Sequence, residues 1–338
     1  MNFLVAMLVF FLGMNLFVAV LAASNNEAAK RVLNMEKLWA GGVLYMIQSK
    51  DKVKPKNVPC ASKTDINDPK LKRKTLVFVR HGESEWNETF NRGKGLGFLY
   101  RLVTSFLREL HELTLADSLM IDSPLSSLGK RQAEDLFHFM NQQKLGTVMY
   151  NLKRAEDVFD RIKNDRGDCK LVSSNLRRAM ATAAIGFGAR LRKTGEKIQI
   201  VPYLQEITRN IDAVSTAAKG EVQSRLGGGS LSKIDTAQVF DPRINTGSKP
   251  VSLTGSKRIE LFAQWLFSQK ESTIVASGHS LYFKTFLNVY LPKSFDHVCK
   301  RKKMKNAGVI TFDIVQDSKG SVMILQDTLT TLYLGYCK

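Results

Sequence analysis

The sequence predicts an α/β fold with a mostly parallel central sheet, and two observations lead to this prediction. First, residues 76–79 form an apolar run in which three of four side chains are β-branched or aromatic. Such a run is typical of a strand that is buried on both faces, as in a parallel sheet. Second, similar short runs at 170–174, 198–201 and 272–276 are separated by stretches with helical periodicity. This alternation favours strands connected by helices that pack on the sheet.

The helical stretches have one apolar face each. Residues 133–140 and 259–266 place apolar side chains at positions i, i+3, i+4 and i+7, which forms a stripe that can cover a sheet. Near the C-terminus, 309–314 and 321–325 are expected to be a last pair of strands around the turn 317–320.

Composition limits the classes of partner. The chain has 338 residues, with 50 basic and 31 acidic side chains and a net charge of +19, which favours phosphorylated substrates or anionic lipid. No nucleic-acid-binding motif accompanies this charge, so nucleic acid is not an expected partner. The four cysteines are far apart and form no CxxC pair, so neither a zinc site nor a disulfide framework is expected.

The N-terminus begins with an uncharged apolar run from Phe3 to Ala23. As a helix it would rise about 31 Å, roughly the hydrocarbon core of a bilayer. A secretory signal peptide would carry Lys or Arg before the run, whereas here Lys30 and Arg31 follow it. We therefore expect a single-pass membrane anchor at 1–23 with a cytosol-facing catalytic domain. The alternative is a cleaved signal peptide and a secreted or lumenal domain.

The rest of the chain divides into a basic linker at 24–73 and a catalytic domain at 74–338. The linker is rich in Lys, Pro, Asp and Asn towards its end, which disfavours a core of its own. Within the domain, an insertion at 88–121 is expected to form a lid or wall of the site. It offers Arg92, Lys94 and Arg101 to the distal part of a substrate.

Two predicted strands are each followed by a histidine at their C-terminal ends. In open α/β sheets, ligands bind at the edge formed by these ends. Strand 76–79 runs into Arg80-His81-Gly82-Glu83-Ser84, with Asn87 behind it, and strand 272–276 runs into Ser277-Gly278-His279-Ser280. The first motif resembles the signature of the histidine phosphatase superfamily, and with the second it forms a specific pair. The resemblance covers 75 to about 314. It implies a three-layer α/β/α sandwich of the phosphoglycerate mutase-like kind.

The resemblance also implies roles for individual residues. His81 would be the nucleophile, and Arg80, Arg178 and His279 would hold the phosphoryl oxygens. Arg178 is chosen because 174–183 is similar to the superfamily's S-x-L-x-R-A-x-x-T-A segment, with Arg177 as the alternative one position earlier. The implied substrate-binding residues are Gly82, Ser84, Asn87 and Ser280. The L-x-E-I element at 204–207 resembles the position of the proton donor in one branch, which implies Glu206 as the acid.

The expected function is that of a metal-independent phosphatase that hydrolyses a phosphate monoester through a phosphohistidine and needs no cofactor. Its substrate would be a phosphorylated small molecule or a phosphoprotein. Mutase-type phosphoryl transfer is an alternative, disfavoured because no Arg pair follows Glu206. The acid-phosphatase branch places an acid directly after the second histidine, where this chain has Ser280. A membrane-tethered module that binds phosphorylated ligands without turnover is the remaining alternative.

Overall fold

The computed structural model describes residues 13, 27–51, 64–115, 117–143, 152–164 and 167–337. Within these residues one sheet has seven strands in the order β4-β3-β2-β5-β1-β6-β7. The strands are β1 Lys72–Arg80, β2 Cys169–Ser173, β3 Ile198–Ile200, β4 Phe240–Asp241, β5 Thr273–Gly278, β6 Val309–Gln316 and β7 Val322–Tyr333. The helices are α2 Glu27–Gln48, α3 Glu85–Asn91, α4 Leu96–Thr114, α5 Ser127–Met140, α6 Leu152–Asn164, α7 Arg177–Gly186, α8 Gly188–Thr194, α9 Thr236–Val239, α10 Gly255–Ser268, α11 Ser280–Tyr290 and α12 Val298–Arg301.

The predicted mostly parallel sheet is confirmed. Strands β1 to β5 pair in parallel, and β6 and β7 add an antiparallel hairpin at one edge. The sequence did not predict β4, because a strand of two residues has no periodicity to detect. Strand β7 runs well past the predicted 321–325.

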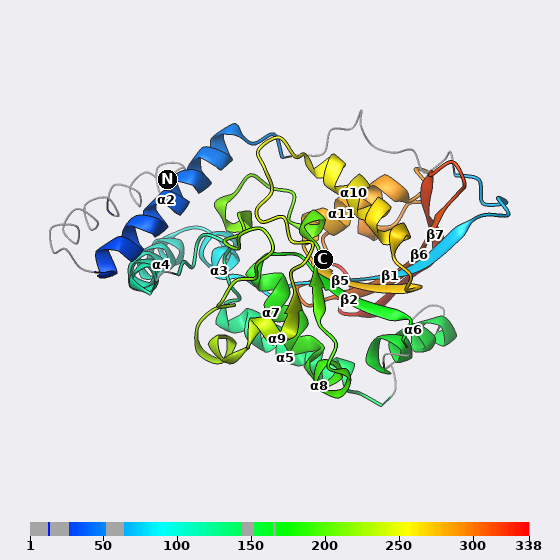
Figure 1. The fold of residues 1–338 in the computed structure, drawn as a ribbon, viewed down its shortest axis with the longest axis horizontal. Coiled ribbons are helices and arrows are strands. Elements are labelled where there is room, and N and C mark those ends of the chain that lie inside the picture. The colour runs from blue at the N-terminus through cyan, green and yellow to red at the C-terminus, as the bar shows by residue number, and fades with distance from the viewer. Residues whose placement is uncertain are drawn as a thin grey trace.

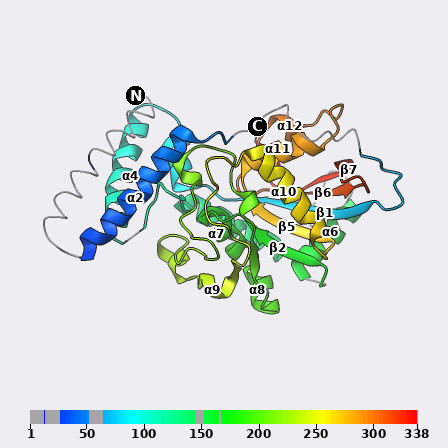
Figure 2. The same cartoon turned by 45° about the horizontal axis from the view of Figure 1, so that its top comes forward.

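Helices cover both faces of the sheet, so the three-layer sandwich is confirmed as well (Figures 1 and 2). In β1 the side chains of Leu76 and Phe78 pack with α10 and α11. The alternate residues Val77 and Val79 pack with α5, α6 and α7 on the other face. This alternation follows from the pleat of a strand that is buried on both sides.

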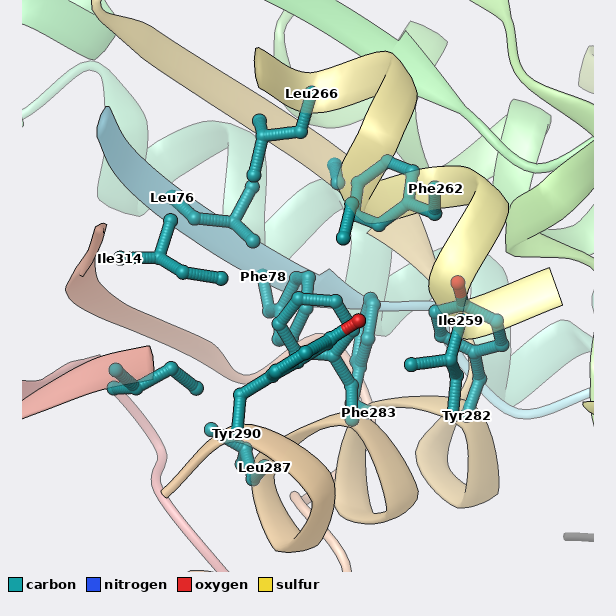
Figure 3. Packing of buried hydrophobic residues seen from close by; sticks show 14 of the residues in the cluster. Leu76, Phe78, Ile259, Phe262, Leu266, Tyr282, Phe283, Leu287, Tyr290 and Ile314 are labelled. Atoms are coloured by element: carbon teal, nitrogen blue, oxygen red, sulfur yellow. The ribbon is translucent and has the colours of Figure 1, made fainter. Parts of the chain in front are cut away.

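Phe78 of β1 faces α11 within the core (Figure 3). Its ring stacks on Phe283 with centroids 4.0 Å apart and meets Phe286 and Phe312 edge to face at 5.2 Å. Each such aromatic pair contributes about 0.5–1.5 kcal/mol beyond its buried area. These contacts fix α11 against β1, and they thereby place the N-terminus of α11 at the edge of the sheet where β1 ends.

A third cluster of buried residues joins the N-terminal helix to the domain. Helix α2 lies along α4, and Trp39 of α2 packs with Trp86, Leu113 and Ile211. The end of the predicted insertion contributes Met120 and Ile121. Trp39 and Tyr45 of the predicted linker are therefore buried, whereas Leu44 and Ile47 of the same helix are exposed.

The predicted anchor at 1–23 lies outside the described residues, apart from Gly13. Among the helices that the structure does describe, none is both long enough and apolar enough to cross a membrane.

Candidate active site

The register between the parallel strands β1 and β5 brings the two histidine motifs together. Arg80 at the end of β1 pairs with Gly278 at the end of β5, and the N–H of His81 donates to the carbonyl of Gly278 at 3.0 Å. The residues that follow, His81 and His279, consequently have ring centroids 5.0 Å apart. Two histidines separated by almost two hundred residues in sequence share one site.

Gly82 shapes the turn after β1. A Cβ atom at this position would lie 2.4 Å from the carbonyl oxygen of Gly129, in the first turn of α5. The N–H of Gly82 donates to Oγ1 of Thr182 at 3.0 Å. Only glycine permits this approach, so the role of Gly82 is to allow the tight turn after β1. Gly82 is not among the residues that line the cleft described next.

A cleft of about 360 Å³ opens at this edge of the sheet. Its lining is almost entirely polar and includes both arginines and the acid predicted from the sequence. The charged and amide side chains around it are Arg80, Glu83, Asn87, Asn91, Arg92, Arg178, Glu206, Asn210, Asp212, Lys303 and Asn306.

A hydrogen bond and burial fix the tautomer of His81. Its Nδ1 lies 2.5 Å from the carbonyl oxygen of Gly82. A carbonyl only accepts, so Nδ1 carries the proton and Nε2 keeps its lone pair. Burial first, and then the charges of Arg178 and Arg80, lower the pKa of His81 well below 6.5. Nε2 makes no hydrogen bond to another described residue, so its lone pair is unpaired within the described residues.

His279 is also buried and neutral. Burial, followed by the charge of Arg178, lowers the pKa of His279 well below 6.5. Its Nε2 lies 2.9 Å from Oγ of Ser174, whereas its Nδ1 is buried without a partner among the described residues.

Arg177 and Arg178 are adjacent on α7 but contact different parts of the protein. Arg178 lines the cleft, donates to the carbonyl of Asp212 at 2.6 Å and lies 3.2 Å from that residue's carboxylate. Arg177 points elsewhere, into an ion pair with Asp117 and hydrogen bonds to three backbone carbonyls. The structure therefore places Arg178, and not Arg177, at the site.

Arg80 is buried against the segment that precedes β6. Its Nη1 donates to the carbonyl of Met304, and its Nε is buried without a partner. The same segment holds Ala307 at φ +56°, in the left-handed region that a residue with a Cβ seldom adopts. Such strain persists where surrounding contacts enforce it, and here it closes the segment over the end of β1.

Glu206 lies between the cleft and the N-terminus of α11. Its Oε1 accepts the N–H groups of Ile207 and Tyr282, each at 2.9 Å. Its Oε2 makes only a long contact of 3.4 Å with the N–H of Leu281. The direction of the side chain is thus fixed through Oε1, while Oε2 makes no short hydrogen bond to the described residues.

Asp212 is a second carboxyl group at the cleft, and no sequence motif selects it. Burial is the main cause that raises the pKa of Asp212, with Arg178 opposing it and Glu206 adding to it. Its Oδ1 is buried without a partner. Irregular backbone around the short 3₁₀ turn Ile211–Ala213 carries no periodic signal, so only the fold reveals this residue.

Two of the other three predicted substrate-binding residues line the cleft, and one does not. Asn87 and Ser280 line the cleft. Ser84 does not, because its Oγ accepts the N–H of Asn87 at 3.2 Å and caps α3. Of the three basic residues expected from the insertion, Arg92 lines the cleft, where it pairs with Glu83 and Glu88.

Lys303 and Asn306 also line the cleft and were missed. Residues 300–305 have the pattern of a solvated basic cluster or a second membrane contact, and a run of lysines does not show which one faces a site. Within the described ranges, no group of three or more His, Cys, Asp and Glu side chains is arranged to hold a metal ion.

No protein-family model and no curated protein matches the chain. Among solved structures, it is similar to a mycobacterial glucosyl-3-phosphoglycerate phosphatase, with 16% identity, 78% of this chain and 99% of that chain covered, and a TM-score of 0.39. A putative α-ribazole-5'-P phosphatase from Escherichia coli has 14% identity, coverage of 78% and 96%, and a TM-score of 0.35. A phosphoserine phosphatase mutant from Entamoeba histolytica has 17% identity, coverage of 75% and 95%, and a TM-score of 0.34.

The identities and TM-scores of these three structures are low. The fold of this chain is therefore read from its own sheet order and layers, and its chemistry from its own side chains.

Proposed function

We propose that this protein is a phosphatase that hydrolyses a phosphate monoester through a phosphohistidine on His81. One observation supports this most strongly. A neutral histidine, hydrogen-bonded through Nδ1, lies at a strand end whose polar cleft is lined by two buried arginines, Arg80 and Arg178. A phosphoryl group needs this combination of a nucleophile and fixed positive charge.

In the first half of the reaction, Arg80 and Arg178 bind the phosphoryl oxygens, with His279 beside them. The Nε2 lone pair of His81 forms a bond to phosphorus as the bond from phosphorus to the ester oxygen breaks. Glu206 gives its proton to the departing alkoxide. In the second half, water attacks phosphorus and gives a proton to the Glu206 carboxylate. The P–N bond then breaks, which releases phosphate and restores His81.

The cleft also indicates the kind of phosphate ester. Amide and charged side chains dominate its lining, and Trp86 and Leu281 are its only two apolar members among the described residues. Such a lining suits a small polar or hydroxylated ester and offers little to a large apolar leaving group.

The decisive experiment assays the full chain on a panel of phosphate esters, with His81→Ala as the control. Release of inorganic phosphate by the wild type alone supports the proposal. Transfer of the phosphoryl group to a second organic acceptor, with little free phosphate, would indicate a mutase. Binding of the esters without turnover would indicate a recognition module.

We also propose that the apolar run at 1–23 anchors the protein with its catalytic domain in the cytosol. The support is the charge order, with Lys30 and Arg31 after the run, and the sequon Asn87-Glu88-Thr89, where a glycan would obstruct the cleft. Protease protection on intact microsomes tests this. A membrane-bound domain digested without detergent supports it, and a protected domain contradicts it.

A further inference from the structure

Asp51, directly after α2, places a buried negative charge between two buried positive charges. Its Oδ2 lies 2.5 Å from Nζ of Lys249, and its Oδ1 lies 2.9 Å from Nη1 of Arg258. The three side chains are at most 1% exposed. We call these three residues the Asp51 cluster.

The Asp51 cluster holds the backbone of the loop that carries Glu206. Nζ of Lys249 donates to the carbonyl of Glu206 at 2.5 Å and to that of Thr208 at 2.8 Å. Nη2 of Arg258 donates to the carbonyl of Glu206 at 3.1 Å, and Asp51 accepts the N–H of Thr208 at 3.3 Å. The carbonyl of Glu206 thus receives hydrogen bonds from both cations.

The side chain of Glu206 is held from the other side by the N–H of Tyr282 in α11. Its backbone position therefore depends on the Asp51 cluster, and its carboxyl direction depends on α11. Both supports must be in place for the acid to reach a leaving group at the cleft.

Asp51 supplies the negative charge that allows Lys249 and Arg258 to be buried close together. Two buried cations that share a carbonyl repel each other unless an anion lies between them. Burial, and next the charge of Arg258, already lower the pKa of Lys249 to about 8, whereas Asp51 acts in the opposite direction. Removal of the Asp51 charge leaves nothing in the cluster to balance Arg258 and Lys249.

We propose that Asp51 is a positioning residue for catalysis, through which the N-terminal segment 27–51 fixes the loop of Glu206. This inference rests on the proposed phosphatase function. It goes beyond that function because it makes proton transfer depend on a residue outside the predicted catalytic domain.

The same segment also packs beside the other carboxyl group of the cleft. A Cβ atom at Gly42 of α2 would lie 3.2 Å from the side chain of Ile211, the neighbour of Asp212. Helix α2 therefore packs on the side chain next to Asp212 while Asp51 supports the backbone of Glu206.

The test uses Asp51→Asn in the full chain, with Glu109→Gln as the matched control. Glu109 is a buried carboxyl that also ties the N-terminal segment to the domain, since it accepts from Nε1 of Trp39 at 3.1 Å. None of the hydrogen bonds that the structure describes for Glu109 involves 205–208. Both variants remove one buried acid near α2, but only Asp51→Asn disturbs the Glu206 loop.

If Asp51 positions the acid, Asp51→Asn lowers kcat/KM for alkyl phosphates about 10- to 100-fold, as expected for a misplaced catalytic group. Aryl phosphates, whose leaving groups need no proton, lose less than about threefold. In a Glu206→Gln background, Asp51→Asn has no further effect on alkyl phosphates. Equal losses on both substrate types, or full additivity with Glu206→Gln, overturn the proposal.

Hydrogen exchange provides a readout that does not depend on turnover. The amides of Ile207 and Thr208 should exchange faster in Asp51→Asn than in the wild type and in Glu109→Gln. If Asp51→Asn fails to fold, Lys249→Met takes its place and should show the same exchange and the same dependence on the leaving group. Unchanged exchange in the variant that folds overturns the positioning role. A wild type that turns over no ester, with the exchange result as expected, refutes the phosphatase proposal and leaves the Asp51 contact standing.

Discussion

Two clusters of buried charge lie on either side of Glu206, and they differ in how fully their hydrogen bonds are made. At the cleft, Nε of Arg80, Oδ1 of Asp212 and Nδ1 of His279 are buried without partners among the described residues. In the Asp51 cluster, Nζ of Lys249 has three acceptors, and both terminal nitrogens of Arg258 are bonded more than once. Only Nε of Arg258 lacks a partner there.

This difference separates a binding role from a supporting role. An unpaired buried donor or acceptor costs about 1–3 kcal/mol, so a fold retains several together only where another group completes them. A phosphoryl oxygen would accept a hydrogen bond from Nε of Arg80 or from a protonated Nδ1 of His279, whereas Oδ1 of Asp212 needs a donor. The Asp51 cluster leaves only Nε of Arg258 without a partner and instead fixes backbone carbonyls. Variants at the cleft should therefore lower the rate of the reaction more than they lower stability. Variants in the Asp51 cluster should mainly change the position of the Glu206 loop and the stability of the fold.

The largest effect is expected at the nucleophile. His81→Ala should lower kcat about 10⁴-fold or more, because it removes the imidazole that is proposed to form the covalent intermediate. The acid-labile phosphoenzyme seen after rapid quenching of the wild type should disappear. Recovery of the label on a serine or a cysteine of the wild type would refute the assignment.

Arg178→Gln should lower kcat/KM about 10²- to 10³-fold, the usual loss when one fixed donor to a developing charge is removed. It should also move the acid limb of the pH–rate profile to higher pH. The Arg178 charge helps to lower the pKa of His81, so its removal lets His81 take up a proton earlier as pH falls. Arg177→Gln is the control. It removes a buried ion pair outside the cleft and should lower stability without moving the acid limb.

Glu206→Gln should lower kcat/KM about 10²-fold for alkyl phosphates and much less for aryl phosphates, since only the former require a proton. Asp212→Asn should lower both substrate types alike, through the loss of its ion pair with Arg178. The reverse pattern, with the dependence on leaving group at Asp212, would make Asp212 the proton donor.

A smaller effect is expected on stability as pH changes. The pKa of His81 and that of His279 both lie well below 6.5 in the folded protein, so the unfolded chain binds more protons at acid pH. The free energy of unfolding should be unaffected by these groups above pH 6.5 and should fall as pH drops below it. Urea unfolding across this range measures the slope. His279→Gln should reduce the slope.

The smallest effect is expected from chelators. The proposed charge stabilisation comes from arginine side chains, so excess EDTA should leave turnover of the phosphate esters within about twofold of its starting value. A large loss that added zinc or magnesium reverses would contradict this and indicate a metal-dependent reaction.

The sequence by itself determined the parts of this protein that depend on local pattern. The buried run at 76–79 predicted a parallel strand, and strand ends predicted where His81 and His279 would lie. The tertiary structure alone decided which of Arg177 and Arg178 faces the cleft. It also brought in Asp212 and Lys303, and it joined Asp51 to Lys249 and Arg258 over sequence separations of 198 and 207 residues. Periodicity reports the face of one element at a time, whereas a cleft and a buried ion pair form where distant loops converge, and only the packed chain defines that convergence.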